Sequence, residues 1–316
     1  MIKPLIDWLV YTVFGMRQGS LFAEALDFFL YDTAKIFLLL AVIIFIVSFI
    51  RTFFPPEKTR AILGRKNRYV GHILAALFGI VTPFCTCSAI PLFLGFIEAG
   101  VPLGVTFSFL VASPMINEIA LVMLWGLFGW KIALIYIASG LVIAIVSGII
   151  IGMMKPEGLL IAATPVSQKK GFGMLDFTAW ERARISRDYT GEIIRKVWPY
   201  VIGGIAVGAW IHGYVPQEFL VRVAGKGNIF AVPIATLIGI PLYSNAAGMI
   251  PMVSALVEKG VSMGTALAFM MAVTGLSLPE FLILKKVMRL KLLLMFAAVV
   301  GSGIIFTGYM FNFLIR

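Results

Sequence analysis

The sequence predicts an all-α, polytopic membrane protein. The chain has 316 residues, of which 60% are hydrophobic and only 13% are charged. Soluble domains are closer to half apolar and a quarter charged. Uncharged stretches of more than 20 residues include 132–154, 228–257 and 292–315. Because a helix needs about 20 apolar residues to cross a bilayer, each of these stretches can span a membrane.

The basic residues predict how the chain is oriented. The net charge is +11, and it comes from clusters that lie between apolar stretches, which indicates membrane orientation rather than nucleic-acid binding. We expect the basic loops 51–68, 155–196 and 285–291 in the cytoplasm. The segment 213–227 has only two basic residues and is expected on the outer side. Residues 1–20 lack the features of a cleavable signal and read as an interfacial segment.

A repeated pattern divides the chain into two halves. Glycine, proline and glutamate recur at one constant spacing, which happens far less often by chance than for apolar residues. The recurring residues are Gly79 with Gly239, Pro91 with Pro251, Glu98 with Glu258, and Gly104 with Gly264. We call this spacing, from Gly79 to Gly239, the repeat offset. We therefore expect a first membrane repeat at 1–153, a cytoplasmic basic loop at 154–191 and a second membrane repeat at 192–316.

Each half contains about five hydrophobic segments. The segments are 21–50, 69–84, 86–98, 103–128 and 131–153 in the first half, and 192–212, 228–242, 245–258, 262–284 and 291–315 in the second. An odd number of segments makes the second repeat enter the membrane from the opposite side. The predicted fold is thus two inverted repeats, an arrangement found in many transporters with a substrate site near the midplane.

The second and third segments of each half are short. Residues 69–84 give about 24 Å of helix at 1.5 Å per residue, less than the ~30 Å of hydrocarbon. Either these segments are tilted, broken helices, or each pair forms a re-entrant hairpin that leaves on the face it entered. Both arrangements keep the overall orientation of the halves.

Both cysteines of the chain lie in the stretch VTPFCTCSAIP, residues 81–91. Pro83 and Pro91 disfavour helix, so we expect irregular backbone between them, at residues 84–90. Such backbone at membrane depth must be buried by protein or line a wet cavity. The predicted substrate-binding residues here are Cys85, Thr86, Cys87 and Ser88.

The equivalent stretch of the second half is IPLYSNAAGMIP, residues 240–251. It has helix-breaking prolines at Pro241 and Pro251, and Ser244 and Asn245 between them. If the repeats are inverted, the two stretches face each other. The site is then asymmetric, with thiols from one half and a hydroxyl and an amide from the other.

The thiol pair favours a soft ligand. Thiolates select thiophilic centres such as trivalent arsenic or Cu(I), and two cysteines separated by one residue cannot form a relaxed disulfide. A closed zinc site needs about four ligands, so we expect no structural metal and no cofactor. The alternative is that the cysteines are small apolar filler.

A second pair of interruptions combines a proline with a glutamate inside an apolar segment. These are ASPMINEIA, residues 112–120, and TGLSLPEFL, residues 274–282. Ionisable groups at this depth are costly and usually functional. The predicted coupling or gating residues are Asn117, Glu118 and Glu280, and the helix breaks are Pro114 and Pro279. The alternative is a helix-start carboxylate that faces backbone amides.

The stretch TPFCTCSAIP resembles the ArsP-type permease family, and SPMINE and the basic loop between the halves are similar to that family too. This resemblance implies a transporter of the cytoplasmic membrane that exports trivalent organoarsenicals, with Cys85 and Cys87 in contact with the substrate. This chain has two cysteines, whereas some arsenical exporters of this type have an additional one.

These observations favour a secondary transporter that works by alternating access, and not an enzyme. No G-x-x-x-x-G-K-[ST] motif is present in the sequence, so the chain has no phosphate-binding loop of an ATP-driven pump. Expected partners are a small thiophilic substrate, membrane lipid and protons as the coupling ion, with oligomerisation left open and no nucleic acid. The alternatives are a channel, a structural membrane subunit, or an intramembrane dithiol redox protein.

Overall fold

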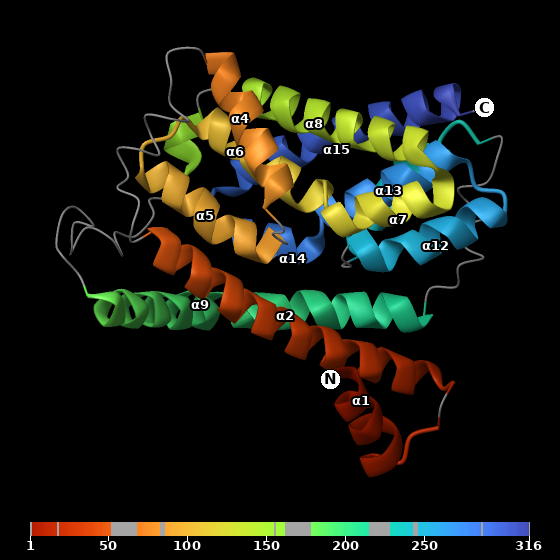
Figure 1. Cartoon of the computed structure of the whole chain (residues 1–316). Coiled ribbons are helices and arrows are strands. Elements are labelled where there is room, and N and C mark those ends of the chain that lie inside the picture. Colours follow the sequence, from red (N-terminus) through yellow and green to blue (C-terminus); the bar gives the residue numbers. More distant parts are fainter. Residues whose placement is uncertain are drawn as a thin grey trace.

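The computed structural model describes residues 2–17, 19–51, 68–82, 86–154, 156–161, 178–214, 228–242, 246–285 and 287–315, and no strand occurs within these ranges (Figure 1). In the N-terminal half the helices are α1 (Ile2–Asp7), η1 (Trp8–Val13), α2 (Leu21–Arg51), α4 (Arg68–Val81), α5 (Thr86–Glu98), α6 (Leu103–Met115), α7 (Glu118–Phe128) and α8 (Trp130–Met153). They are followed by η2 (Pro156–Leu159), α9 (Ala179–Tyr214), α11 (Ala231–Gly239), α12 (Ala246–Glu258), α13 (Met263–Gly275), α14 (Leu278–Leu284) and α15 (Leu290–Leu314).

Several of these helices are able to cross a membrane. Four apolar spans are long enough, at 21–46, 130–153, 263–284 and 290–314. A fifth consists of α6 and α7, which are bent by 51° at a short break. The protein is therefore a multi-pass membrane protein, as its composition predicts.

The helices of the two halves correspond at the repeat offset. The starts of α5 and α12 are separated by this spacing, and so are the starts of α6 and α13 and those of α8 and α15. Their packing corresponds as well. A Cβ on Gly79 of α4 would meet Phe109 and Ala112 of α6, and a Cβ on Gly239 of α11 would meet their counterparts Phe269 and Ala272 of α13.

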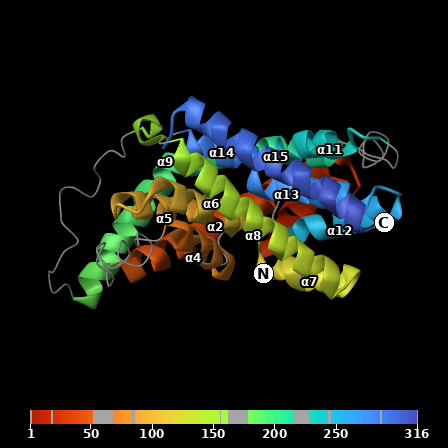
Figure 2. The ribbon, with the colours of Figure 1, turned by 90° about the horizontal axis from the view of Figure 1, so that it is seen from above.

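Several contacts between the halves join counterpart helices. α6 contacts its counterpart α13, α8 contacts α15, and α2 contacts α9. In addition, α5 contacts α14 while α7 contacts α12, so that exchanging the halves converts one contact into the other. The views in Figures 1 and 2 both place α8 beside α15.

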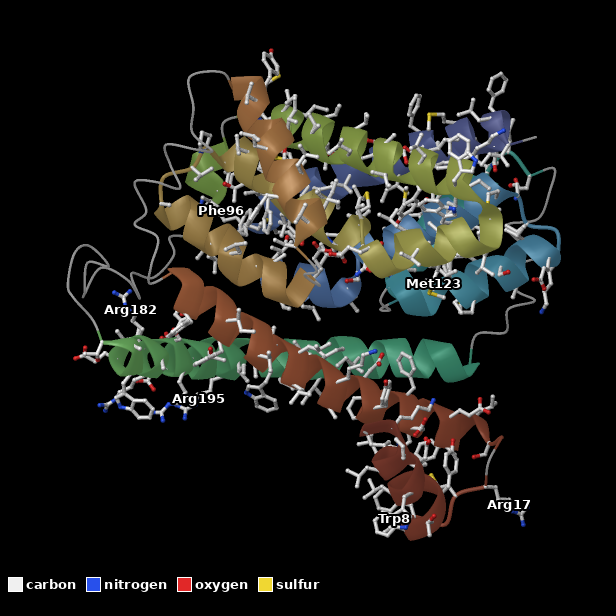
Figure 3. The ribbon with its side chains drawn as sticks, in the orientation of Figure 1. Trp8, Arg17, Phe96, Met123, Arg182 and Arg195 are labelled. Atoms are coloured by element: carbon white, nitrogen blue, oxygen red, sulfur yellow. The ribbon has the colours of Figure 1, made fainter. Side chains whose placement is uncertain are left out.

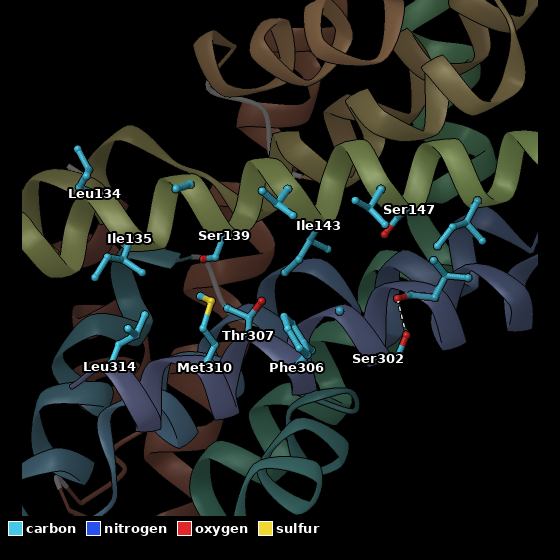
Figure 4. A pocket seen from close by; sticks show the side chains of 16 residues that line it. Leu134, Ile135, Ser139, Ile143, Ser147, Ser302, Phe306, Thr307, Met310 and Leu314 are labelled. Carbon is cyan, nitrogen blue, oxygen red and sulfur yellow. Dashed lines mark hydrogen bonds between the residues drawn. The ribbon is translucent and has the colours of Figure 1, made fainter. Parts of the chain in front are cut away.

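α8 and α15 run antiparallel. Figure 4 shows Leu134 and Leu314 at one end of the pair and Ser147 and Ser302 at the other. At the crossing, Gly303 of α15 lies against Ile143 of α8, with the missing Cβ only 3.2 Å from the isoleucine Cγ2. A glycine at this point lets the two backbones approach closely, as is common for helices in membranes.

Aromatic packing holds the first half around α6. Phe96 of α5 lies between α5 and the α4–α6 pair (Figure 3), with its ring 5.2 Å from Phe109 and 6.2 Å from Phe78 between centroids. Phe107, on another face of α6, contacts both Phe93 of α5 and Phe296 of α15. The buried core is therefore continuous from one half to the other.

The segment between the halves includes the start of a long helix. α9 begins at Ala179, inside the segment 154–191 that separates the two predicted membrane repeats. Its start has a capping box, in which the Thr178 hydroxyl accepts from the Glu181 N–H and Glu181 accepts from the Thr178 N–H. Earlier in the same segment, residues 159–161 pair with residues 287–289 between α14 and α15.

Pro91 and Pro251 were expected to break the helix, and this expectation is wrong. Pro91 lies inside α5 and Pro251 inside α12, and both helices continue past the proline. The expected irregular backbone at residues 84–90 is also wrong from Thr86 onward, where α5 begins. A proline inside a helix removes one hydrogen bond, and a membrane helix tolerates this when neighbouring groups satisfy the freed carbonyl.

Candidate functional site

The two broken helices meet at the centre of the protein. The break between α6 and α7 follows Met115, and the break between α13 and α14 follows Gly275, its counterpart at the repeat offset. These two residues touch: a Cβ on Gly275 would lie 3.1 Å from the Met115 Cε. The two interruptions that combine proline and glutamate in the sequence are thus side by side.

In the first half, side chains satisfy the backbone groups that the break exposes. The Tyr136 hydroxyl of α8 donates to the Met115 carbonyl at 2.6 Å, and the tyrosine is fully buried. The Ala120 N–H donates to the Asn117 Oδ1 at 3.4 Å, which caps the start of α7. Pro114 is the penultimate residue of α6, next to the break it was predicted to cause.

The second half is built differently. The Leu278 N–H donates to the Ile240 carbonyl at 2.9 Å, which ties the start of α14 to the end of α11 just before Pro241. Pro279 occupies the first turn of α14, and its N-cap Ser277 makes no side-chain cap. The counterpart of Tyr136 is Phe296, whose ring has no hydroxyl to donate.

Glu280 is the most unusual side chain at this centre. It is 1% exposed, and within the described residues neither of its carboxyl oxygens has a hydrogen-bond partner. Glu118 lies at the first position of α7 and is partly exposed. The two are not counterparts, because the repeat offset places Glu118 on Leu278 and Glu280 on Ala120.

The thiol stretch lies at the start of α5. α4 ends at Val81, where the Thr82 hydroxyl donates to the Phe78 carbonyl at 2.8 Å. Thr86, Cys87 and Ser88 form the first turn of α5; their side chains lie outside the described part of the structure. So do residues 83–85 and 243–245, which include Cys85 and Pro83, and Ser244 and Asn245. α5 itself packs against α14, the helix that carries Glu280.

Two polar features of the structure were not predicted from the sequence. One is Tyr136, which lies in an uncharged stretch and has no local signal of its role. The other is a buried pair in the first half, where His72 Nδ1 and Ser108 Oγ are hydrogen-bonded at 2.9 Å. Their counterparts, Val232 and Ala268, are apolar. Comparing the two halves residue by residue at the repeat offset would have singled out both features.

An open apolar groove of about 720 Å³ lies between α8 and α15 (Figure 4). Its polar groups are hydroxyls from Ser139, Ser147, Ser302 and Thr307, and no charged residue lines it. The Ser139 and Ser302 hydroxyls donate to carbonyls of their own helices. The groove therefore offers no site for an ionic or metal ligand. Among the described residues, no three His, Cys, Asp or Glu side chains are grouped to hold a metal ion.

The chain is similar to curated proteins of other organisms. The chain is 23% identical over 305 residues to the UPF0718 protein MJ0584 of Methanocaldococcus jannaschii, covering 79% of this chain and 84% of that protein. It is 26% identical over 276 residues to the UPF0718 protein YraQ of Escherichia coli, covering 83% and 73%. No solved structure matches it significantly.

A third relative carries a more informative name. This is the "Putative two-component membrane permease complex subunit" of Streptococcus mutans, 28% identical over 260 residues that cover 79% of this chain and 82% of the relative. The sequence model of the ArsP_1 family, described as "Predicted permease", matches residues 21–313. With a match that covers nearly the whole membrane region, the chain belongs to the ArsP_1 family of predicted permeases.

Proposed function

We propose that this protein is a secondary transporter of the cytoplasmic membrane. In this proposal it exports small thiophilic compounds, such as trivalent organoarsenicals, by alternating access between two inverted halves. The observation that carries the proposal is the meeting of two broken helices, at Met115 and Gly275, between the halves. Broken helices that meet at a repeat interface are the place where many transporters bind substrate.

The antiparallel pair α8 and α15 supports the inverted orientation. Each helix is long enough to span the membrane, and the two occupy equivalent places in their repeats. Counterpart spans that run in opposite directions favour opposite orientations of the two repeats in the membrane. The pairing of residues 159–161 with 287–289 brings the end of α8 and the start of α15 to one side. Basic loops adjoin both, which favours the cytoplasmic side.

The thiol pair supports a soft substrate. Cys87 lies in the first turn of α5, a helix that packs on α14 and α6 beside the central break. Cys85 and Cys87 would bind the thiophilic centre, and Ser244 and Asn245 would line the opposite wall. The name of the Streptococcus mutans relative favours a permease that works together with a second subunit.

Transport into inside-out vesicles tests this proposal. Vesicles that contain the protein are expected to accumulate phenylarsine oxide above the passive background of empty vesicles, with arsenic measured by mass spectrometry. Cys85→Ser combined with Cys87→Ser is expected to abolish the accumulation at equal membrane expression, because the hydroxyl is a hard donor with little affinity for trivalent arsenic. Transport by the double variant at the wild-type rate would remove the thiol site, and inorganic arsenite tests whether the organic group matters.

A further inference from the structure

Glu280 is a buried carboxyl that no described counter-charge bonds. Both of its oxygens are buried and without a hydrogen-bond partner among the described residues. A carboxylate in such a place is strongly disfavoured unless it is paired, and it takes up a proton instead. In this conformation the group is therefore expected to be a neutral carboxylic acid.

The alternative to a functional role is that Glu280 caps the start of α14. Ser277 and Glu280 have the spacing of a capping box, in which the glutamate accepts from the N-cap backbone N–H. The Ser277 backbone N–H does lie close to the Glu280 carboxyl, but neither carboxyl oxygen meets the geometry of a formed hydrogen bond. In the first half the cap at this point comes from Asn117 to Ala120, without any carboxylate. The first half thus shows that a cap at this point does not require a carboxyl group.

Comparison of the halves shows that the fold does not need this carboxyl. The counterpart of Glu280 is Ala120, which is completely buried, so the same architecture forms with a methyl group at this position. The carboxyl is an addition to the second half only. An ionisable group that a membrane protein buries without a packing requirement is by default functional.

The neighbouring helices provide no fixed counter-charge in the part of the structure that is described. α14 packs on α9 and α5 and touches α15 through Phe281 and Phe296. The charged residues with described side chains on α9 lie between Glu181 and Arg195, and none of them bonds to Glu280. Lys285 and Lys291 are exposed. The remaining titratable groups on α5 are Cys87 and Glu98, whose side chains lie outside the described part.

We infer that Glu280, and not Glu118, is the proton-binding site of the transport cycle. Its carboxylate takes up one proton from water and is neutral in the conformation described here. It releases that proton to water when the halves rearrange and the break between α13 and α14 becomes wet. The role in transport depends on the proposed function, whereas proton binding by this carboxyl does not.

Infrared difference spectroscopy tests proton binding directly. Purified full-length protein in lipid bilayers is titrated with pH, and the carbonyl-stretch band of a protonated carboxyl is followed. The band is expected in the wild type, lost in Glu280→Gln, and kept in Glu118→Gln and in Glu258→Gln, which alters an exposed carboxyl that accepts from Ser254. A band that persists unchanged in Glu280→Gln would overturn the assignment. Glu280→Ala, which copies the alanine of the first half, gives a second variant for the same test.

Vesicle transport then separates the two proposals. Acceleration of phenylarsine oxide uptake by a pH gradient is expected in the wild type and in Glu258→Gln, and it is expected to disappear in Glu280→Gln. If the infrared band is lost in Glu280→Gln but the wild type carries no arsenical, the transport proposal fails and the proton site stands. If the wild type transports and Glu280→Gln keeps both the band and the acceleration, the proton site fails.

Discussion

Removing one hydroxyl group tests how the broken helix of the first half is stabilised. In Tyr136→Phe, the Met115 carbonyl loses the hydrogen bond that it receives at 2.6 Å. The phenylalanine ring fits the position, since Phe296 is the counterpart in the second half and is also fully buried. The change therefore removes one hydrogen bond and leaves the packing of the ring almost intact.

The expected loss of stability follows from what can replace the lost donor. Interhelical hydrogen bonds in membranes average about 0.6 kcal/mol and reach about 1.7 kcal/mol. A buried carbonyl left without a donor costs about 1–3 kcal/mol. Because neither water nor lipid offers a donor at this fully buried site, we expect a decrease of about 1.5 kcal/mol in the free energy of unfolding.

Equilibrium unfolding in lipid bicelles measures this decrease. Tyr309→Phe is the matched control: its hydroxyl donates to the Ile229 carbonyl at an exposed place, close to the end of α15 rather than in the buried core. We expect a change below about 0.5 kcal/mol for this control. Equal losses in the two variants, or no loss in Tyr136→Phe, would refute the reasoning about the broken helix.

Two further predictions concern a helix contact and a helix start. In Gly104→Ala, the new Cβ would lie 2.5 Å from the Gly148 carbonyl oxygen. The helices α6 and α8 must then separate by roughly 1 Å, at a cost of about 1–3 kcal/mol, which thermal unfolding should show. The control Gly126→Ala, at an open position, should stabilise α7 slightly. Hydrogen bonds from Thr178 hold the pKa of Glu181 below its ordinary value. The stabilisation that these hydrogen bonds give to the start of α9 is therefore fully present above the ordinary pKa of a glutamate, and it is lost as the pH falls through the lowered pKa. Amide hydrogen exchange at the start of α9, corrected for its intrinsic pH dependence, should therefore become faster on acidification in the wild type. In Glu181→Gln the corrected exchange rate should not change with pH.

Much of the fold could be predicted from hydrophobic segments and their spacing. The segment 86–98 is α5 to the residue, and the segment 131–153 matches α8 except at its first residue. The proline and glutamate in residues 112–120 mark a real break, because Pro114 and the N-cap Asn117 both favour a helix boundary there. Pro91 also disfavours helix, but it lies inside a helix that packs against α6 and α14. There the tertiary packing outweighs the single lost hydrogen bond.

The candidate site could be predicted only in part. Sequence reasoning favours Glu118 over Glu280, since both glutamates share an apolar segment with a proline but Lys285 and Lys286 close to Glu280 indicate an interfacial position. Burial separates them, and burial depends on the helix face that α5, α9 and α15 cover, which no local pattern encodes. Tyr136 was missed for the same reason: its partner is a backbone carbonyl that becomes free only because another helix breaks.

The proposed mechanism requires the two halves to cross the membrane in opposite directions. Lys66 and Lys226 are separated by the repeat offset and are therefore counterparts in the two halves. Each is changed singly to cysteine in a background that lacks Cys85 and Cys87, and intact cells are treated with a membrane-impermeant maleimide. We predict that Lys226→Cys is labelled at once and that Lys66→Cys is labelled only after the cells are opened. Labelling of both positions from the same side would contradict the account.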